Sequence, residues 1–105
     1  MPIHNNQVNF NTSDVTTSSG VCTINTQAGR ITTDNLTSTS GAEITINNSL
    51  ITTSSVILIT GSGADYQTNP VTLGIVTQTT GQVVLYAKMD ANFTTELIIH
   101  YLIIN

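Results

Sequence analysis

Residues 41–60, GAEITINNSLITTSSVILIT, carry the pattern that decides the fold. Residues 44–46, Ile-Thr-Ile, alternate with the two-residue period of a strand that has one buried and one solvated face. Residues 47–49, Asn-Asn-Ser, are types favoured in turns, and residues 55–60 then form a nearly continuous apolar run. The stretch therefore predicts a strand, a turn and a further strand.

Outside this stretch the chain keeps the same mixture of Thr, Ser and Asn with Ile, Val and Leu. β-Branched residues suit a pleated, half-buried surface, and no apolar period of 3.6 residues runs long enough to predict a helix. Candidate strands follow one another at intervals of roughly 8–12 residues, which is typical of a β-sandwich or a barrel. We therefore predict an all-β fold of about seven or eight short strands. The expected strands cover residues 21–25, 29–36, 42–46, 55–60, 71–78, 83–89 and 96–104.

The length of 105 residues fits one domain. We assign residues 20–105 to the β-sandwich domain and residues 1–19 to an N-terminal arm with at most one strand. The start of this arm lacks the basic and apolar regions of a signal peptide. Ile3, Val8 and Phe10 give the arm apolar groups to bury, which supports docking on a neighbouring chain or on another protein surface. The alternative is a frayed terminus.

The charge of the chain is low and negative. Charged residues make up 8% of the sequence, against a usual share of about 25%, and the formal net charge is −4. Arg30 and Lys88 are the two cations and lie far apart, whereas nucleic acids and anionic membranes bind clustered Lys and Arg. We therefore expect neither nucleic acid nor a membrane as a partner. Cys22 is the single cysteine, so no internal disulfide forms, and its strand-like setting predicts a buried thiol.

Groups suited to catalysis or metal binding are scattered along the chain. His4 and His100 are remote from each other, the six acidic residues do not cluster, and no metal-binding spacing occurs. We predict a protein with no enzymatic activity, no metal and no cofactor, in which His100 is a hydrogen-bonded core or interface residue. A polar loop with one aromatic residue is the best candidate for a sugar-binding site, and an ordinary loop is the alternative. The loop residues are Asp65, Tyr66, Gln67 and Asn69.

The closing strand, residues 97–104, is apolar on both of its faces. A sandwich strand normally buries one face and leaves the other in water, so this strand needs a second cover. We interpret it as the interface of an oligomer, because an uncovered face would form a sizeable apolar patch on a monomer. The alternative is a cover supplied by residues 3–10 of the same chain. The predicted interface residues are Leu97, Ile98, Ile99, His100, Tyr101 and Leu102.

Several short motifs between residues 28 and 60 follow one another in an order that is similar to a known pattern. These motifs are Ala28-Gly29, Ile31-Thr32-Thr33, Leu36-Thr37, Gly41, Ile44-Thr45-Ile46, Asn48-Ser49 and Ser55-Val56. Together they resemble a short β-rich domain of virion proteins from aquatic tailed phages and large algal viruses. The apolar closing strand also resembles that family's ending, whereas Glu43 departs from it where an aromatic residue is frequent. The N-terminal arm lies outside the resemblance.

The resemblance implies a single antiparallel β-sandwich of jelly-roll type, as in capsid decoration proteins and fibre heads, which are commonly trimeric. It therefore implies a structural virion protein, and we expect a capsid decoration (cement) protein that stabilises the shell as a trimer. The implied partners are other copies of the chain and the major capsid protein or another virion protein. The implied location is the virion, after assembly in the host cytoplasm. The alternative function is the receptor- or carbohydrate-binding head of a viral fibre.

Overall fold

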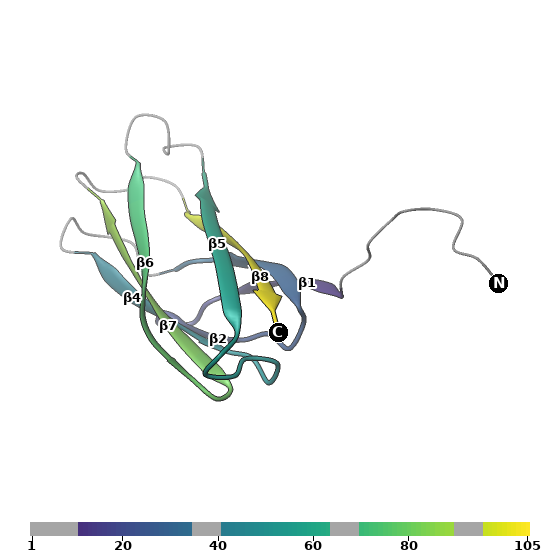
Figure 1. Cartoon of the computed structure of the whole chain (residues 1–105). Helices are drawn as coiled ribbons and strands as arrows, with labels where there is room; N and C mark the ends of the chain where they lie inside the picture. The colour runs from purple at the N-terminus through teal and green to yellow at the C-terminus, as the bar shows by residue number, and fades with distance from the viewer. Residues whose placement is uncertain (1–10, 35–40, 64–69, 90–95) are drawn as a thin grey trace, which may run out of the picture.

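The computed structural model describes residues 11–34, 41–63, 70–89 and 96–105, and these residues form eight β-strands (Figure 1). The strands are β1 (Thr12–Thr16), β2 (Val21–Thr23), β3 (Ala28–Thr32), β4 (Ala42–Asn47), β5 (Val56–Ser62), β6 (Val71–Thr79), β7 (Gln82–Met89) and β8 (Ile98–Ile104). The all-β prediction is confirmed. Strands fall where β-branched residues alternate with Thr and Asn, as the two-residue period requires.

The strands form two four-stranded sheets that pack face to face as a sandwich. Sheet A has the order β1-β3-β8-β5, and sheet B has the order β2-β4-β7-β6. Most neighbours run antiparallel, but β1 pairs with β3, and β2 with β4, in parallel. The prediction of a purely antiparallel sandwich is therefore wrong for these two pairs. The reason is that each early connection crosses to the other sheet, so alternate strands become neighbours that run in the same direction.

Strand β1 lies within the stretch predicted as an N-terminal arm. It is paired along its whole length with β3, from Thr12 opposite Ala28 to Thr16 opposite Thr32, so the sandwich includes residues before residue 20. The turn that follows β1 is held by the carboxylate of Asp34, which accepts hydrogen bonds from the Thr17 hydroxyl and from two backbone N–H groups of the turn. The candidate arm residues Ile3, Val8 and Phe10 lie outside the described residues.

The core lies between the sheets and consists of the side chains at every second position of the strands, which face inward. Ile31, Ile44, Leu85 and Ile99 have no exposed surface. Cys22 belongs to the same core, so the prediction of a buried thiol is confirmed. Burial disfavours the charged thiolate and raises the pKa of Cys22 to about 11, which keeps the thiol protonated at neutral pH.

A buried polar network attaches the loop between β2 and β3 to β8. The Tyr101 hydroxyl and the Asn48 side-chain amide both donate to the backbone carbonyl of Thr26, each at 2.8 Å. Gly29 lets this region pack closely, because a Cβ there would lie 2.6 Å from the Ser13 carbonyl oxygen and 3.0 Å from the Tyr101 ring. The network therefore satisfies polar atoms that the apolar core would otherwise leave without partners.

Candidate functional site

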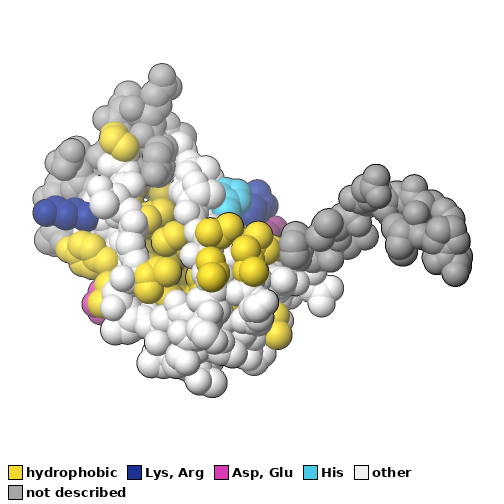
Figure 2. Space-filling model, in the orientation of Figure 1, with side chains coloured by type: hydrophobic (Ala, Val, Ile, Leu, Met, Phe, Trp, Pro, Cys, Tyr) yellow, Lys and Arg dark blue, Asp and Glu magenta, His cyan; other side chains and the backbone are white. Residues whose placement is uncertain are grey.

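Among the described residues, the register brings a group of exposed apolar side chains together on the outer face of sheet A. In the ladder between β5 and β8, Val56 lies opposite Ile104 and Leu58 lies opposite Leu102. Val56 is 54% exposed, Leu58 51% and Ile104 44%, and Leu102 is half-buried. Because alternate residues of a strand share a face, these four side chains form one patch, which we call the apolar face. Figure 2 shows hydrophobic side chains gathered over β5 and β8, beside the histidine.

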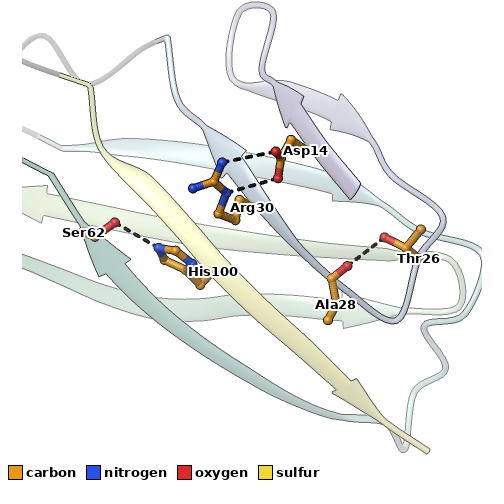
Figure 3. A network of polar contacts seen from close by, with 6 residues as sticks. All are labelled: Asp14, Thr26, Ala28, Arg30, Ser62 and His100. Atoms are coloured by element: carbon orange, nitrogen blue, oxygen red, sulfur yellow. Dashed lines mark hydrogen bonds and ion pairs between the residues drawn. The ribbon is translucent and has the colours of Figure 1, made fainter. Parts of the chain in front are cut away.

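A row of polar side chains borders the apolar face. Asp14, Arg30, His100 and Thr60 lie in register across the four strands of sheet A. The Arg30 guanidinium donates two hydrogen bonds to the Asp14 carboxylate, at 3.1 and 3.2 Å (Figure 3). These bonds hold the pKa of Asp14 below its ordinary value and raise that of Arg30. Both side chains are exposed, so the ion pair stabilises the fold little.

His100 occupies the middle of this row and is hydrogen-bonded, as predicted. Its Nε2 lies 2.9 Å from the hydroxyl oxygen of Ser62, which belongs to the neighbouring strand β5 (Figure 3). A serine next to a histidine also begins a nucleophilic site, but such a site needs a carboxylate to orient the ring. The carboxylate of the row, Asp14, is instead bound to Arg30. The hydrogen bond between Ser62 and His100 therefore links β5 to β8 at the border of the apolar face.

Two open hollows lie on this side of sheet A. One, of about 220 Å³, is lined by Leu58, Ile59, Thr60, His100, Tyr101 and Leu102. The other, of about 370 Å³, is lined by Thr12, Ser13, Asp14, Ala28, Gly29, Arg30, His100 and Tyr101. Both are lined in part by His100 and Tyr101 of strand β8. Open hollows of this kind suit an extended chain or a second protein surface more than an enclosed small molecule.

The predicted interface residues divide between the two sides of β8. Leu97, Ile99 and Tyr101 are buried in the core of the domain itself. Ile98, His100 and Leu102 lie on the outer face and are half-buried. Sheet B therefore covers the inner face of the closing strand, and the second cover predicted from the sequence would have to lie on the outer face. The residues of the candidate sugar-binding loop, Asp65, Tyr66, Gln67 and Asn69, lie outside the described residues.

Sequence reasoning missed the contribution of Val56, Leu58 and Ile104 to the exposed surface. The apolar run over residues 55–60 was visible in the sequence, and its continuity was the signal that both sides of this strand are apolar. The ladder with β8 then joins two such strands into one face.

The comparisons with known proteins return no match, whether with family models, with curated proteins or with solved structures. Among the described residues, no three or more His, Cys, Asp and Glu side chains are grouped so that they could hold a metal ion. The described part of the chain also has no helix long and apolar enough to cross a membrane.

Proposed function

We propose that this chain is a structural protein that associates with itself and docks on a larger assembly, namely a capsid decoration (cement) protein that acts as a trimer. The observation that carries the proposal is the apolar face on sheet A. Val56 and Leu58 are more than half exposed, although they are large apolar groups on a regular strand. Neighbouring exposed groups of this kind mark interaction surfaces on soluble domains.

The energetics of association support the proposal. Complete burial of one exposed large apolar side chain contributes about 1.5–3 kcal/mol. The four side chains of the apolar face are already partly covered, so each has part of this contribution left to gain at a contact between subunits. The polar row beside them matches the usual arrangement of an apolar centre with a polar rim. A decoration protein adds such modest contacts at many places on a shell. Their sum raises the stability of the shell through linkage between binding and assembly.

The strand pairing supports a jelly-roll type for the core of the sandwich. β3 and β4 pair antiparallel with β8 and β7, and β5 and β6 then flank the same two strands. This nesting of one strand pair against another is how a jelly roll is wound. In this proposal β1 and β2 are additions at the sheet edges, where their parallel pairing leaves the six-strand arrangement intact.

Sedimentation velocity of the full chain tests the proposal. We expect a trimer at micromolar concentration, and we expect Leu58→Asp to shift it to a monomer, because an unpaired carboxylate is costly to bury. Val21→Asp is the matched control, since Val21 is 45% exposed but lies on β2 in sheet B. A wild-type chain that sediments as a monomer, or a Leu58→Asp variant that stays trimeric, would contradict the proposal. Circular dichroism of each variant checks that the fold is kept.

A further inference from the structure

The described chain begins at the end of sheet A where the apolar face lies. Thr12, Ala28, Leu102 and Leu58 stand in one row across the four strands. β1 and β3 start at this end of the sheet, and β8 runs toward it. The pair formed by Val56 and Ile104 lies one step further toward the same end. β1 is the edge strand opposite β5, so the chain enters sheet A at the same end as the apolar face but at the opposite edge.

The ten residues before Asn11 have the composition of a segment that can cover this face. They contain Ile3, Val8 and Phe10 and no Asp, Glu, Lys or Arg. The apolar face likewise consists of uncharged side chains, so a contact between the two would bury no unpaired charge. Ten residues can span up to about 33 Å, whereas four strands are about 14 Å across. The segment is thus long enough to cross the whole sheet.

The geometry at Asn11 favours the face of another copy over the face of the same chain. The Asn11 carbonyl accepts a hydrogen bond from the Ala28 N–H at 3.1 Å, so the pairing of β1 with β3 extends to this residue. A chain that continued in the direction of β1 would move away from the end of the sheet. To fold back onto its own sheet, the chain would need a turn of about four residues before Asn11. That turn would include Val8 and Phe10, which would then not lie over the sheet.

We infer that residues 1–10 of one copy lie on the apolar face of a second copy, with Val8 and Phe10 packed against Leu58 and Leu102. This inference rests on the proposed function, because it names what covers the face through which the subunits associate. The contact joins two different surfaces, a segment and a sheet face. Such head-to-tail contacts close into rings when the rotation between copies allows it, which is compatible with a trimer.

Two variants of the full chain separate the segment from the face. Val8→Ser combined with Phe10→Ser weakens the segment, and Leu58→Asp weakens the face. We expect each variant alone to dissociate, with a dissociation constant raised roughly tenfold or more. Asn5→Ser combined with Asn6→Ser is the matched control within the segment, and it should leave the oligomer unchanged. Circular dichroism confirms folding, and Val56→Asp replaces Leu58→Asp if the latter does not fold.

Mixing the two weakened variants decides between the occupants of the face. The variant with Val8→Ser and Phe10→Ser keeps an intact face, and Leu58→Asp keeps an intact segment. The segment of the second can bind the face of the first, so an equimolar mixture should form a heterodimer in sedimentation velocity. If the mixture stays monomeric, the segment acts within its own chain or on another protein, and the inference fails. If the segment variant remains an oligomer while Leu58→Asp dissociates, the inference fails but the proposed function stands. If Leu58→Asp remains an oligomer, the proposed function itself fails.

Discussion

The outer faces of sheets A and B are built from the same kind of strand but carry different side chains. On sheet A, the facing pairs of β5 and β8 are Val56 with Ile104 and Leu58 with Leu102. On sheet B, the outer-face pairs of the equivalent strands β6 and β7 are Gly74 with Tyr86 and Thr77 with Val84. Between β4 and β7, the side chains of Asn47 and Gln82 are hydrogen-bonded at 2.9 Å. Both sheets are solvated on this side in the single chain. The difference shows that the apolar face of sheet A is not a requirement of the sandwich itself.

Exposed apolar residues on sheet B are placed differently. Ile75 and Val76, at 43% and 50% exposure, lie at a β-bulge of the edge strand β6. A bulge bends an edge strand and interrupts its ladder, which hinders pairing with another chain. On the inner strand β7, Val84 and Tyr86 face outward, but the register sets them opposite Thr, Glu and Gly residues. Sheet B therefore has a protected edge and a mixed outer face, whereas sheet A sets apolar side chains opposite one another. We expect sheet A to make the contacts between subunits.

The largest effect on association should come from replacing the apolar side chains on the outer face of sheet A with polar ones. We expect the combined change Val56→Thr, Leu58→Thr and Leu102→Thr to raise the dissociation constant of the oligomer at least about a hundredfold, because each change removes apolar area from the contact. Threonine preserves strand propensity, so the monomer should remain folded. Sedimentation velocity over a range of concentrations measures the effect.

The reverse change completes this test. Asn47→Leu with Gln82→Leu gives sheet B a pair like that of Leu58 and Leu102, and it should create a second, weaker mode of association. If the threonine variant associates as tightly as the wild type, the apolar face is not the contact between subunits. The comparison of the two sheets would then have no functional meaning.

The sequence was sufficient to place most strands, because their patterns are local. The strand expected over residues 42–46 is observed as β4, and the strand expected over residues 83–89 is observed as β7. The parallel pairs could not be predicted in this way, since strand direction depends on which connections cross between the sheets. Likewise, the apolar character of β8 was readable, but the register that sets Leu58 beside Leu102 is a long-range property. The interface prediction therefore included inward-facing residues of β8.

A second prediction separates the two sides of strand β8. Ile99 is fully buried, and Ile99→Ala should lower the free energy of unfolding by about 2–5 kcal/mol, since it leaves a cavity in the core. Ile98 lies on the outer side and is half-buried, so Ile98→Ala should cost clearly less. Urea denaturation of both variants measures the difference. Equal losses would mean that the outer side of β8 is as tightly covered as the core.

A third prediction concerns the turn by which the chain leaves sheet A for sheet B. Hydrogen bonds from Thr17 and from the N–H groups of Gly20 and Ser19 hold the pKa of Asp34 below its ordinary value of 3.8. A lowered pKa in the folded state stabilises the protein above the unfolded pKa, and this contribution is lost as pH falls through the folded pKa. Asp34→Asn should therefore be less stable than the wild type at pH 7, and the difference should shrink in acid.

Urea denaturation at pH 7 and at pH values below 3.8 provides the measurement for Asp34. Asp14→Asn is the matched control, because the pKa of Asp14 is also lowered but its partner is the exposed side chain of Arg30 rather than a turn. We expect the control to change stability less at neutral pH. A loss of stability in Asp34→Asn that is the same at every pH would show that the carboxylate charge has no part in holding the turn.

The smallest effect is expected at the polar row that borders the apolar face. Arg30 and Asp14 are 57% and 67% exposed, and exposed ion pairs are screened by water and salt. Arg30→Ala should therefore leave the free energy of unfolding nearly unchanged. The effect of Arg30→Ala on the oligomer shows where the contact between subunits ends. If another subunit enclosed the ion pair, water would no longer screen it, and breaking it would weaken association strongly. We expect unchanged sedimentation, with the row at the solvated rim. If Arg30→Ala dissociates instead, the contact between subunits also buries the outer side of β3 and β1, and the apolar face is only a part of that contact.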